Sequence, residues 1–154
     1  MKPQQPEALQ IRLERRIPAS PDRVFAAWTE PELLRQWSSP EGTTVEGGEL
    51  DVRVGGRWRF VLVERNGTKK EAFGIYREVT PPKRLIYTHA WVTPDDATES
   101  SPETVVTVEF HADAGATRVV LTQVGFGTTA GRDGHRAGWF SSINRLEALF
   151  ADKS

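Results

Sequence analysis

One long stretch of the chain, Thr43 to Phe126, places apolar residues at every second position and is cut by short turn signals. Alternation with a period of two is typical of strands that bury one face. The turn signals are Gly55-Gly56, Asn66-Gly67, Pro81-Pro82, the polar segment Thr93–Pro102 and Ala114-Gly115. They divide the stretch into six strands, and strands joined by such short connections run antiparallel.

Two of these turn signals allow another interpretation. Asp95–Ser101 is polar and acidic, and we predict a mobile loop there rather than a domain linker, because strand patterning resumes directly after it. Asn66-Gly67-Thr68 matches a glycosylation sequon, but a hairpin turn is needed at this point. We therefore favour the turn.

Helical signals lie on either side of the stretch. Leu9 to Ile17 alternates and predicts a further strand. Ser20-Pro21 then predicts the start of a short helix, and Glu30-Pro31 ends it and begins a second short helix. The resulting order is strand, two helices, six strands and a final helix.

The final helix is predicted over Ala130 to Asp152. Apolar residues recur there at intervals of four, three and four, which places them on one stripe: Trp139, Ile143, Leu146 and Phe150, widened by Phe140 and Leu149. A helix with such a stripe must bury it, and the sheet is the available partner. The sequence therefore predicts an α+β fold.

Composition sets limits on what this fold can do. The chain has 154 residues, which favours a single domain over 1–154 with a core from about 9 to 151. Its 20 basic and 21 acidic residues give a net charge of −1, so nucleic acid and anionic membranes are not expected partners. There is no cysteine, no apolar run of the roughly 20 residues that span a bilayer, and no apolar leader in Met1 to Gln10. We expect a cytoplasmic protein.

Five tryptophans are distributed over this pattern, at positions 28, 37, 58, 91 and 139, and three of them are predicted to point at one interior. Two-residue hairpin loops fix which residues lie opposite one another. Loops at Gly55-Gly56 and Asn66-Gly67 would pair Arg53 with Trp58 and Phe60 with Phe73. Both loops then predict one apolar face, made of Trp58, Phe60, Leu62, Phe73 and Ile75.

The remaining strands extend that face. A loop at Ala114-Gly115 pairs Phe110 with Val119, Val108 with Leu121, and Val106 with Gln123. On the strand after Pro82, one side carries Leu85, Tyr87, His89 and Trp91, and its aromatic content predicts that it faces inward. The same counting places Tyr76 on the outer face.

Two polar residues, Asp51 and Arg53, would share the interior face. Buried charges are costly unless paired or solvated, so the two are expected either to form a structural ion pair at one end of the core or to anchor a ligand. Gly55 could instead begin a bulged turn, which would move Asp51 and Arg53 to the outside.

Several motifs together resemble the START-like, helix-grip (SRPBCC) superfamily, and within it the homologues of the heat-shock-protein-90 ATPase activator. These motifs are Ile17-Pro-Ala-Ser-Pro-Asp-Arg-Val-Phe25, Ala27-Trp28-Thr29, Glu30-Pro31-Glu32-Leu33, Trp37, Asp51–Gly56, Tyr76–Pro82, Arg84-Leu85, Val106–Phe110 and Gly138-Trp139. The resemblance implies a curved antiparallel sheet of about seven strands around a long C-terminal helix, with an internal cavity between them.

Several functions occur in this superfamily. The resemblance implies binding of lipids, hormones or polyketide-like molecules, a cyclase or hydratase activity, or stimulation of a chaperone ATPase. Two positions depart from the usual pattern: His89 stands where a second tryptophan is common, and Gln123 where a histidine is common. Both changes are expected to make the cavity wall more polar and smaller.

Residues for catalysis are few. The chain contains three histidines, His89, His111 and His135, and none shows metal-ligand spacing, so no metal or cofactor is expected. We expect His111 to be exposed beside Arg118, and His135 either to be a surface residue or to overhang the cavity mouth. His89 is either a hydrogen-bonded core residue or, with Arg53, an acid–base group of a cyclase or dehydratase.

The leading hypothesis is that a small, largely apolar molecule binds in the cavity. The wall is predicted to be formed by Trp58, Phe60, Phe73, Ile75, Tyr87, Trp91, Val108, Leu121, Trp139 and Ile143. Arg53, His89 and Gln123 would orient a polar group of the ligand. The alternatives are an interaction module for a chaperone and, third, an enzyme. We also consider a homodimer.

Overall fold

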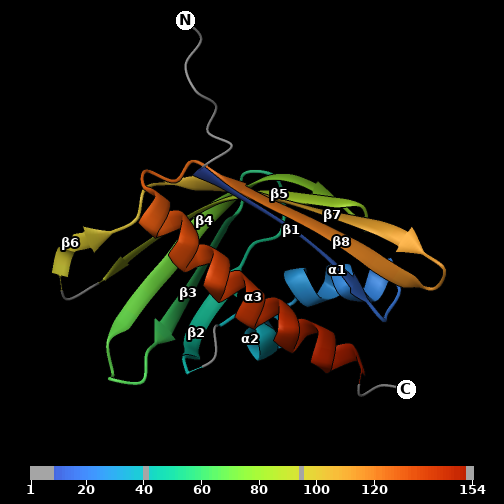
Figure 1. The fold of residues 1–154 in the computed structure, drawn as a ribbon, viewed down its shortest axis with the longest axis horizontal. Coiled ribbons are helices and arrows are strands. Elements are labelled where there is room, and N and C mark those ends of the chain that lie inside the picture. Colours follow the sequence, from blue (N-terminus) through green and yellow to red (C-terminus); the bar gives the residue numbers. More distant parts are fainter. Residues whose placement is uncertain (1–8, 40–41, 94–95, 152–154) are drawn as a thin grey trace, which may run out of the picture.

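A curved antiparallel sheet wraps around a long C-terminal helix in the computed structural model of the chain, which describes residues 9–39, 42–93 and 96–151 (Figure 1). The strand order is β1-β8-β7-β5-β4-β3-β2, and β6 pairs with β5 outside this path. The strands are β1 (Gln10–Ile17), β2 (Thr44–Leu50), β3 (Arg57–Val63), β4 (Lys69–Thr80), β5 (Arg84–Thr93), β6 (Asp96–Ser100), β7 (Thr104–Asp113) and β8 (Ala116–Val124). The predicted fold class is confirmed.

The strand β6 corrects one prediction. The segment Asp95–Ser101 was expected to be a loop because it is polar and has few apolar residues. Five of its residues instead form β6 and pair with the end of β5, with Ser100 opposite Val92. Backbone pairing at an open edge needs no apolar face, so the side-chain pattern gave no sign of this strand.

Two short helices follow β1, as predicted: α1 (Pro21–Thr29) and α2 (Pro31–Trp37). Each begins with a proline, whose missing N–H is not needed in the first turn. The two helices are joined through their tryptophans. The Nε1–H of Trp37 donates to the carbonyl of Ala27 at 3.0 Å, and the Trp28 and Trp37 rings pack edge to face with centroids 4.5 Å apart.

The long helix α3 (Thr129–Ala151) agrees with the predicted span except at its ends, and Asp152 lies outside the described residues. Its second half is anchored, since Ile143, Leu146 and Phe150 are buried and Arg15 of β1 reaches Glu147 at 2.8 Å. Phe140, expected to widen the apolar stripe, is 46% exposed, because the stripe follows Ile143 and Leu146 toward β1 and α2.

The hairpin between β7 and β8 has the predicted register. Ala114 and Gly115 have φ angles of 52° and 89°, which is the positive-φ pair of a two-residue type I′ turn. Phe110 consequently lies opposite Val119, Val108 opposite Leu121 and Val106 opposite Gln123.

The hairpin between β3 and β4 is shifted by one residue from the prediction. Glu64 N–H donates to the carbonyl of Thr68 at 2.8 Å, so the loop contains three residues and Gly67 takes the positive φ of 88°. Phe60 lies opposite Ala72 instead of Phe73. A shift of one residue turns every side chain of β4 to the other face.

The connection between β2 and β3 is also longer than predicted. β2 ends at Leu50, which lies opposite Trp58, and residues 51–56 form an irregular turn. The side chains of Asp51 and Arg53 pair at 3.0 Å, but on the exposed surface of this turn. A β-carbon on Gly56 would lie 1.9 Å from the carbonyl oxygen of Asp51, so this turn requires glycine there.

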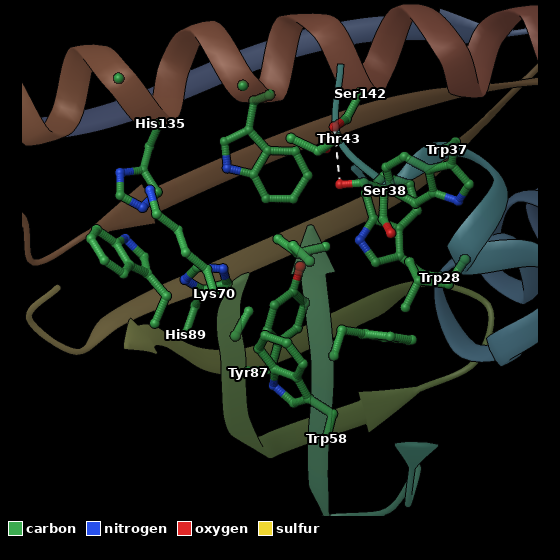
Figure 2. A pocket seen from close by; sticks show the side chains of 18 of the residues that line it. Trp28, Trp37, Ser38, Thr43, Trp58, Lys70, Tyr87, His89, His135 and Ser142 are labelled. Carbon is green, nitrogen blue, oxygen red and sulfur yellow. Dashed lines mark hydrogen bonds between the residues drawn. The ribbon is translucent and has the colours of Figure 1, made fainter. Parts of the chain in front are cut away.

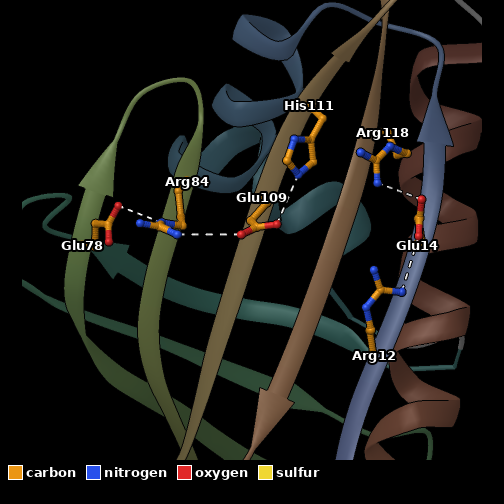
Figure 3. A network of polar contacts seen from close by, with 7 residues as sticks. All are labelled: Arg12, Glu14, Glu78, Arg84, Glu109, His111 and Arg118. Carbon is orange, nitrogen blue, oxygen red and sulfur yellow. Dashed lines mark hydrogen bonds and ion pairs between the residues drawn. The ribbon is translucent and has the colours of Figure 1, made fainter.

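Ion pairs cross the strands on the outer face of the sheet (Figure 3). Arg84 of β5 lies between Glu78 of β4 and Glu109 of β7, at 3.0 and 3.8 Å. Hydrogen bonding to Arg84 lowers the pKa of Glu78. His111 lies exposed on this face, in register with Arg118, as predicted. Exposed pairs of this kind contribute little to stability, and they mark this face as the one turned to solvent.

Candidate functional site: an aromatic cavity under the last helix

A cavity of about 500 Å³ lies between the first half of α3, the strands β3, β4 and β5, and the helices α1 and α2. All five tryptophans line it, together with both tyrosines. Three tryptophans were predicted to share one interior, and the structure adds the other two. Figure 2 shows Trp28 and Trp37 at one end of the cavity and His89, His135 and Lys70 at the other.

Alternate residues of three neighbouring strands form the floor. Trp58 and Phe60 come from β3, Ala72 and Tyr76 from β4, and Tyr87 from β5. Small residues on β4 leave space for the large rings of β3. The Trp58 Nε1–H passes over Gly74 and donates to the carbonyl of Thr88 at 3.0 Å, and a β-carbon on Gly74 would lie 2.5 Å from that nitrogen.

The roof is a face of α3 on which three glycines alternate with larger residues. Gly131, Gly134 and Gly138 line the cavity on this face, and a β-carbon on Gly134 would meet no atom within 4 Å. The open space therefore exists because α3 has glycines where a packed helix would have apolar side chains. The helix approaches the floor through His135 and Trp139.

A buried chain of hydrogen bonds holds Trp139 in place. Its Nε1–H donates to Oε1 of Gln123 at 2.7 Å, and Nε2 of Gln123 donates to Oγ1 of Thr104 at 2.8 Å. The hydroxyl of Thr104 in turn donates to the backbone carbonyl of His89 at 3.0 Å. Gln123 thus lies behind the cavity wall and positions two of the residues that form it.

Polar side chains gather at one end of the cavity. The rings of His89 on β5 and His135 on α3 pack edge to face, with centroids 5.9 Å apart. Lys70 lies over the ring of Trp91, 4.4 Å from its centroid, and pairs with Glu64 at 3.1 Å. His135 therefore overhangs the cavity, which was one of the two positions expected for it.

Burial controls the ionisation of the groups in the wall. It lowers the pKa of His89 to about 4, with a smaller contribution from the nearby His135, so the imidazole is neutral at physiological pH. The side chain of His89 is half-buried and lines the cavity. Burial also raises the pKa of both Tyr76 and Tyr87, which keeps their hydroxyls protonated.

The opposite end combines Trp28 and Trp37 with the small polar residues Ser38, Thr43 and Ser142. The Trp28 indole lies close enough to Tyr87 to lower the pKa of the tyrosine slightly against the effect of burial, yet its Nε1–H has no well-aligned acceptor among the described residues. The hydroxyl of Ser142 donates to the carbonyl of Ser38 at 3.1 Å and connects α3 to the end of α2. These contacts close the cavity beside the short helices.

The predicted site residues divide into three groups. Six line the cavity: Trp58, Phe60, Tyr87, His89, Trp91 and Trp139. Four are fully buried behind the wall and do not line it: Val108, Leu121, Gln123 and Ile143. Three point to the outside: Arg53, Phe73 and Ile75.

The three outward residues follow from the two hairpins that differ from prediction. Phe73 and Ile75 are 38% and 41% exposed, because the three-residue loop turns Ala72, Gly74 and Tyr76 inward instead. Tyr76, predicted to face outward, is buried and lines the cavity. Since Arg53 lies on the surface, it does not pair with His89, and the neighbour of His89 is His135.

The sequence reasoning missed several residues of the wall, namely Trp28, Trp37, Lys70, Tyr76 and the glycines of α3. The glycines carried a usable signal. Three of them occur within eight residues of a helix that is otherwise long and regular, at spacings of three and four. Glycine is costly inside a helix, so a repeated glycine on one face indicates that the face must stay open.

The described part of the chain shows neither a metal site nor a membrane-spanning helix. No group of three or more histidine, cysteine or acidic side chains within residues 9–39, 42–93 and 96–151 is arranged to hold a metal ion. Over the same residues, no helix has the length and apolar character needed to cross a membrane.

A curved antiparallel sheet that encloses a cavity against a C-terminal helix defines a helix-grip protein. The chain belongs to the family of Activator of Hsp90 ATPase homolog 1-like proteins, whose family model matches residues 18–151, and hence to the SRPBCC superfamily. The predicted family is confirmed. A comparison with curated proteins finds no match.

Solved structures show the same fold over nearly the whole chain. A protein from Chromobacterium violaceum is 30% identical, with a TM-score of 0.83 and 92% of this chain and 96% of that chain covered. An AHSA1 protein from Silicibacter pomeroyi is also 30% identical, with a TM-score of 0.82 and coverage of 94% and 99%. A protein from Nitrosomonas europaea is 27% identical, with a TM-score of 0.79 and coverage of 96% and 97%.

Proposed function

We propose that the protein binds a small, largely apolar molecule in the cavity under α3. The observation that carries this proposal is that five indole rings and two phenol rings surround a space of about 500 Å³. Ligand pockets of proteins commonly measure roughly 300–1,000 Å³ and combine apolar walls with a few polar groups. Here the basic side chains of the wall, His89, His135 and Lys70, are gathered at one end.

The energetic cost of the glycines in α3 and of an unfilled cavity supports ligand binding in this cavity. Each glycine inside a helix costs about 1 kcal/mol relative to alanine, and an unfilled cavity forfeits dispersion contacts along its walls. Gly131, Gly134 and Gly138 all lie on the face that roofs the cavity. A bound apolar ligand would restore the missing contacts.

Filling the cavity from α3 tests the proposal. A leucine at Gly134 places its side chain in open space, so Gly134→Leu should remove binding of the neutral dye Nile red, followed by its fluorescence. Leucine is a better helix former than glycine by about 1 kcal/mol, so the variant should be at least as stable as the parent protein. Native mass spectrometry of the unmodified protein should also show a retained small molecule.

The matched control is Ala137→Leu, which adds a leucine to an exposed position of the same helix and should leave dye binding unchanged. If the parent protein does not bind the dye and retains no molecule, the cavity is not a general site for apolar ligands. Equal dye binding by the parent protein and Gly134→Leu would place the dye elsewhere and would also contradict the proposal.

A chaperone partner is the second candidate function. The family description supports it, and so does an apolar patch on the outer surface formed by Val54, Phe73 and Ile75, which are 64%, 38% and 41% exposed. Phe73 and Ile75 alternate on β4, and Gly55 beside Val54 bonds to the carbonyl of Tyr76. Exposed patches of this kind are typical of protein contacts.

The test of this candidate is an ATPase assay with the cell's own heat-shock-protein-90 chaperone. The absence of stimulation at a saturating concentration of the protein rejects it.

A further inference from the structure

We propose that the cavity selects aromatic ligands that carry a hydroxyl group, and that the imidazole rings of His89 and His135 accept the hydrogen bond from that hydroxyl. This inference rests on the proposed function, because it assigns a ligand class to the same cavity. It depends on which ring nitrogens face the cavity as acceptors: a contact fixes the proton of His135, and the shielding of Nδ1 leaves Nε2 of His89 to face the cavity.

The proton of His135 is placed by its helix. Nδ1 lies 2.8 Å from the carbonyl oxygen of Gly131, one turn earlier in α3. A carbonyl can only accept, so Nδ1 must carry the proton and donate it. When the ring is neutral, Nε2 is therefore an acceptor, and no described residue bonds to it.

The ring of His89 is oriented in a similar way. Its Nδ1 is shielded from solvent and has no hydrogen-bond partner among the described residues. No contact of the protein therefore fixes the proton of this ring, and a ligand hydroxyl selects the tautomer with the proton on Nδ1, which leaves Nε2 as an acceptor. Because the ring lines the cavity, the nitrogen left to face the open space is Nε2, again an acceptor.

When both rings are neutral, the two imidazoles thus present acceptor nitrogens at one end of an aromatic space. A buried acceptor without a donor is costly, so a ligand that supplies a donor has an advantage over one that does not. A ligand carboxylate supplies none. It could bind these rings only by protonating one, and burial makes protonation of His89 unfavourable.

The charged groups nearby disfavour a cationic donor. Among the described residues that line the cavity, Glu64 is the one carboxylic acid, and it is paired with Lys70 at 3.1 Å. The ammonium of Lys70 would repel a ligand cation at this end. A neutral hydroxyl avoids both penalties.

The surrounding rings explain why the hydroxyl should be attached to an aromatic system. The indole of Trp58 lies tilted over His89, with centroids 5.5 Å apart, and the ring of Phe126 lies 5.0 Å from that of His135. A flat aromatic ligand can stack among such rings and still direct a hydroxyl in its own plane toward the histidines.

Three probes of similar shape test this inference: 2-naphthol, its methyl ether 2-methoxynaphthalene, and 2-naphthoate. Isothermal titration calorimetry at neutral pH should show that 2-naphthol binds about tenfold more tightly than the ether, since the ether cannot donate. His89→Phe and His135→Phe keep a planar ring and remove the acceptor. Each should reduce the preference for naphthol several-fold, and the double variant should abolish it.

The affinity for 2-methoxynaphthalene shows whether each variant keeps an intact cavity, because the ether makes no use of the acceptors. The matched control, His111→Phe, changes a histidine on the outer face and should keep the full preference for naphthol.

Equal affinity of the parent protein for naphthol and ether would overturn the inference and leave the proposed function standing. Tightest binding of naphthoate would overturn it too, in favour of an anion site at Lys70. If none of the three binds while Nile red does, only the inference fails, and if Nile red also fails, the proposed function fails with it.

Discussion

His89 shows at the level of a single residue how the surroundings decide what a side chain can do. Its ring lies between Trp58 and His135, and its backbone carbonyl is held by Thr104. Burial lowers the pKa of the ring to about 4, compared with about 6.5 in an unfolded chain. A histidine in this state accepts hydrogen bonds but carries no charge, which suits a role in binding a neutral donor.

The same shift makes a prediction about stability. Between pH 6.5 and 4 the unfolded chain binds a proton at His89 that the folded protein does not bind, so the free energy of unfolding should fall as the pH drops through this window. The loss from this residue is at most about 3 kcal/mol. In His89→Phe this part of the pH dependence should disappear, as measured by urea unfolding at several pH values. His111→Gln is the matched control on the outer face, and a slope unchanged by His89→Phe would contradict the prediction.

At the level of elements, two hairpins with similar signals behave differently. Ala114-Gly115 and Asn66-Gly67 both present a small or turn-forming residue before glycine. The first forms a two-residue loop, while in the second the Oδ1 atom of Asn66 accepts a hydrogen bond from the N–H of Thr68 at 2.9 Å and the loop contains three residues. This one additional residue decides that Tyr76 lines the cavity and that Phe73 does not.

A substitution in the type I′ turn between β7 and β8 is expected to stabilise the protein. Ala114 adopts a φ of 52°, a region in which a β-carbon is strained and in which asparagine is tolerated better. We expect Ala114→Asn to raise the free energy of unfolding by roughly 0.5–1 kcal/mol, as measured by urea denaturation. Gly115→Ala, at a φ of 89°, should lower it by a comparable amount or more. No gain in Ala114→Asn would mean that the turn is not under strain.

At the level of the whole molecule, the two faces of the sheet carry different kinds of residues. Its concave face, α3 and the short helices surround the aromatic cavity (Figure 2). Its convex face carries exposed ion pairs such as Arg84 with Glu78 (Figure 3). The patch of Val54, Phe73 and Ile75 also lies outside the cavity. Binding of a ligand inside and of a protein outside would therefore use separate residues.

This separation predicts how the two candidate functions respond to mutation. If the protein stimulates a chaperone ATPase through the patch, Phe73→Ser should reduce the stimulation and leave Nile red binding intact. Gly134→Leu should have the opposite effect, because it fills the cavity and leaves the patch unchanged. Loss of both activities in either variant would show that the two faces do not work independently.

Local patterns were sufficient to predict the order of the elements with the exception of β6. The prolines at positions 21 and 31 begin two helices, the alternation of apolar residues marks the long strands, and the stripe through Ile143 and Leu146 marks the last helix. These features depend on neighbours within one turn or one strand, so they can be read along the chain. The same holds for the side of β5 that carries Tyr87 and His89.

The composition of the cavity wall was decided by contacts between distant segments. Whether Phe73 or Tyr76 faces inward depends on the length of the loop between β3 and β4, and the residue types in that loop are compatible with either length. A register shift of one residue between the two strands moves each side chain of β4 to the opposite face of the sheet. The placement of Trp28, Trp37 and the glycines of α3 around one space depends on how the helices pack on the sheet. The sequence by itself determined the family, the element order apart from β6, and a shared aromatic interior. The tertiary structure decided which rings surround an open space and which only fill the core.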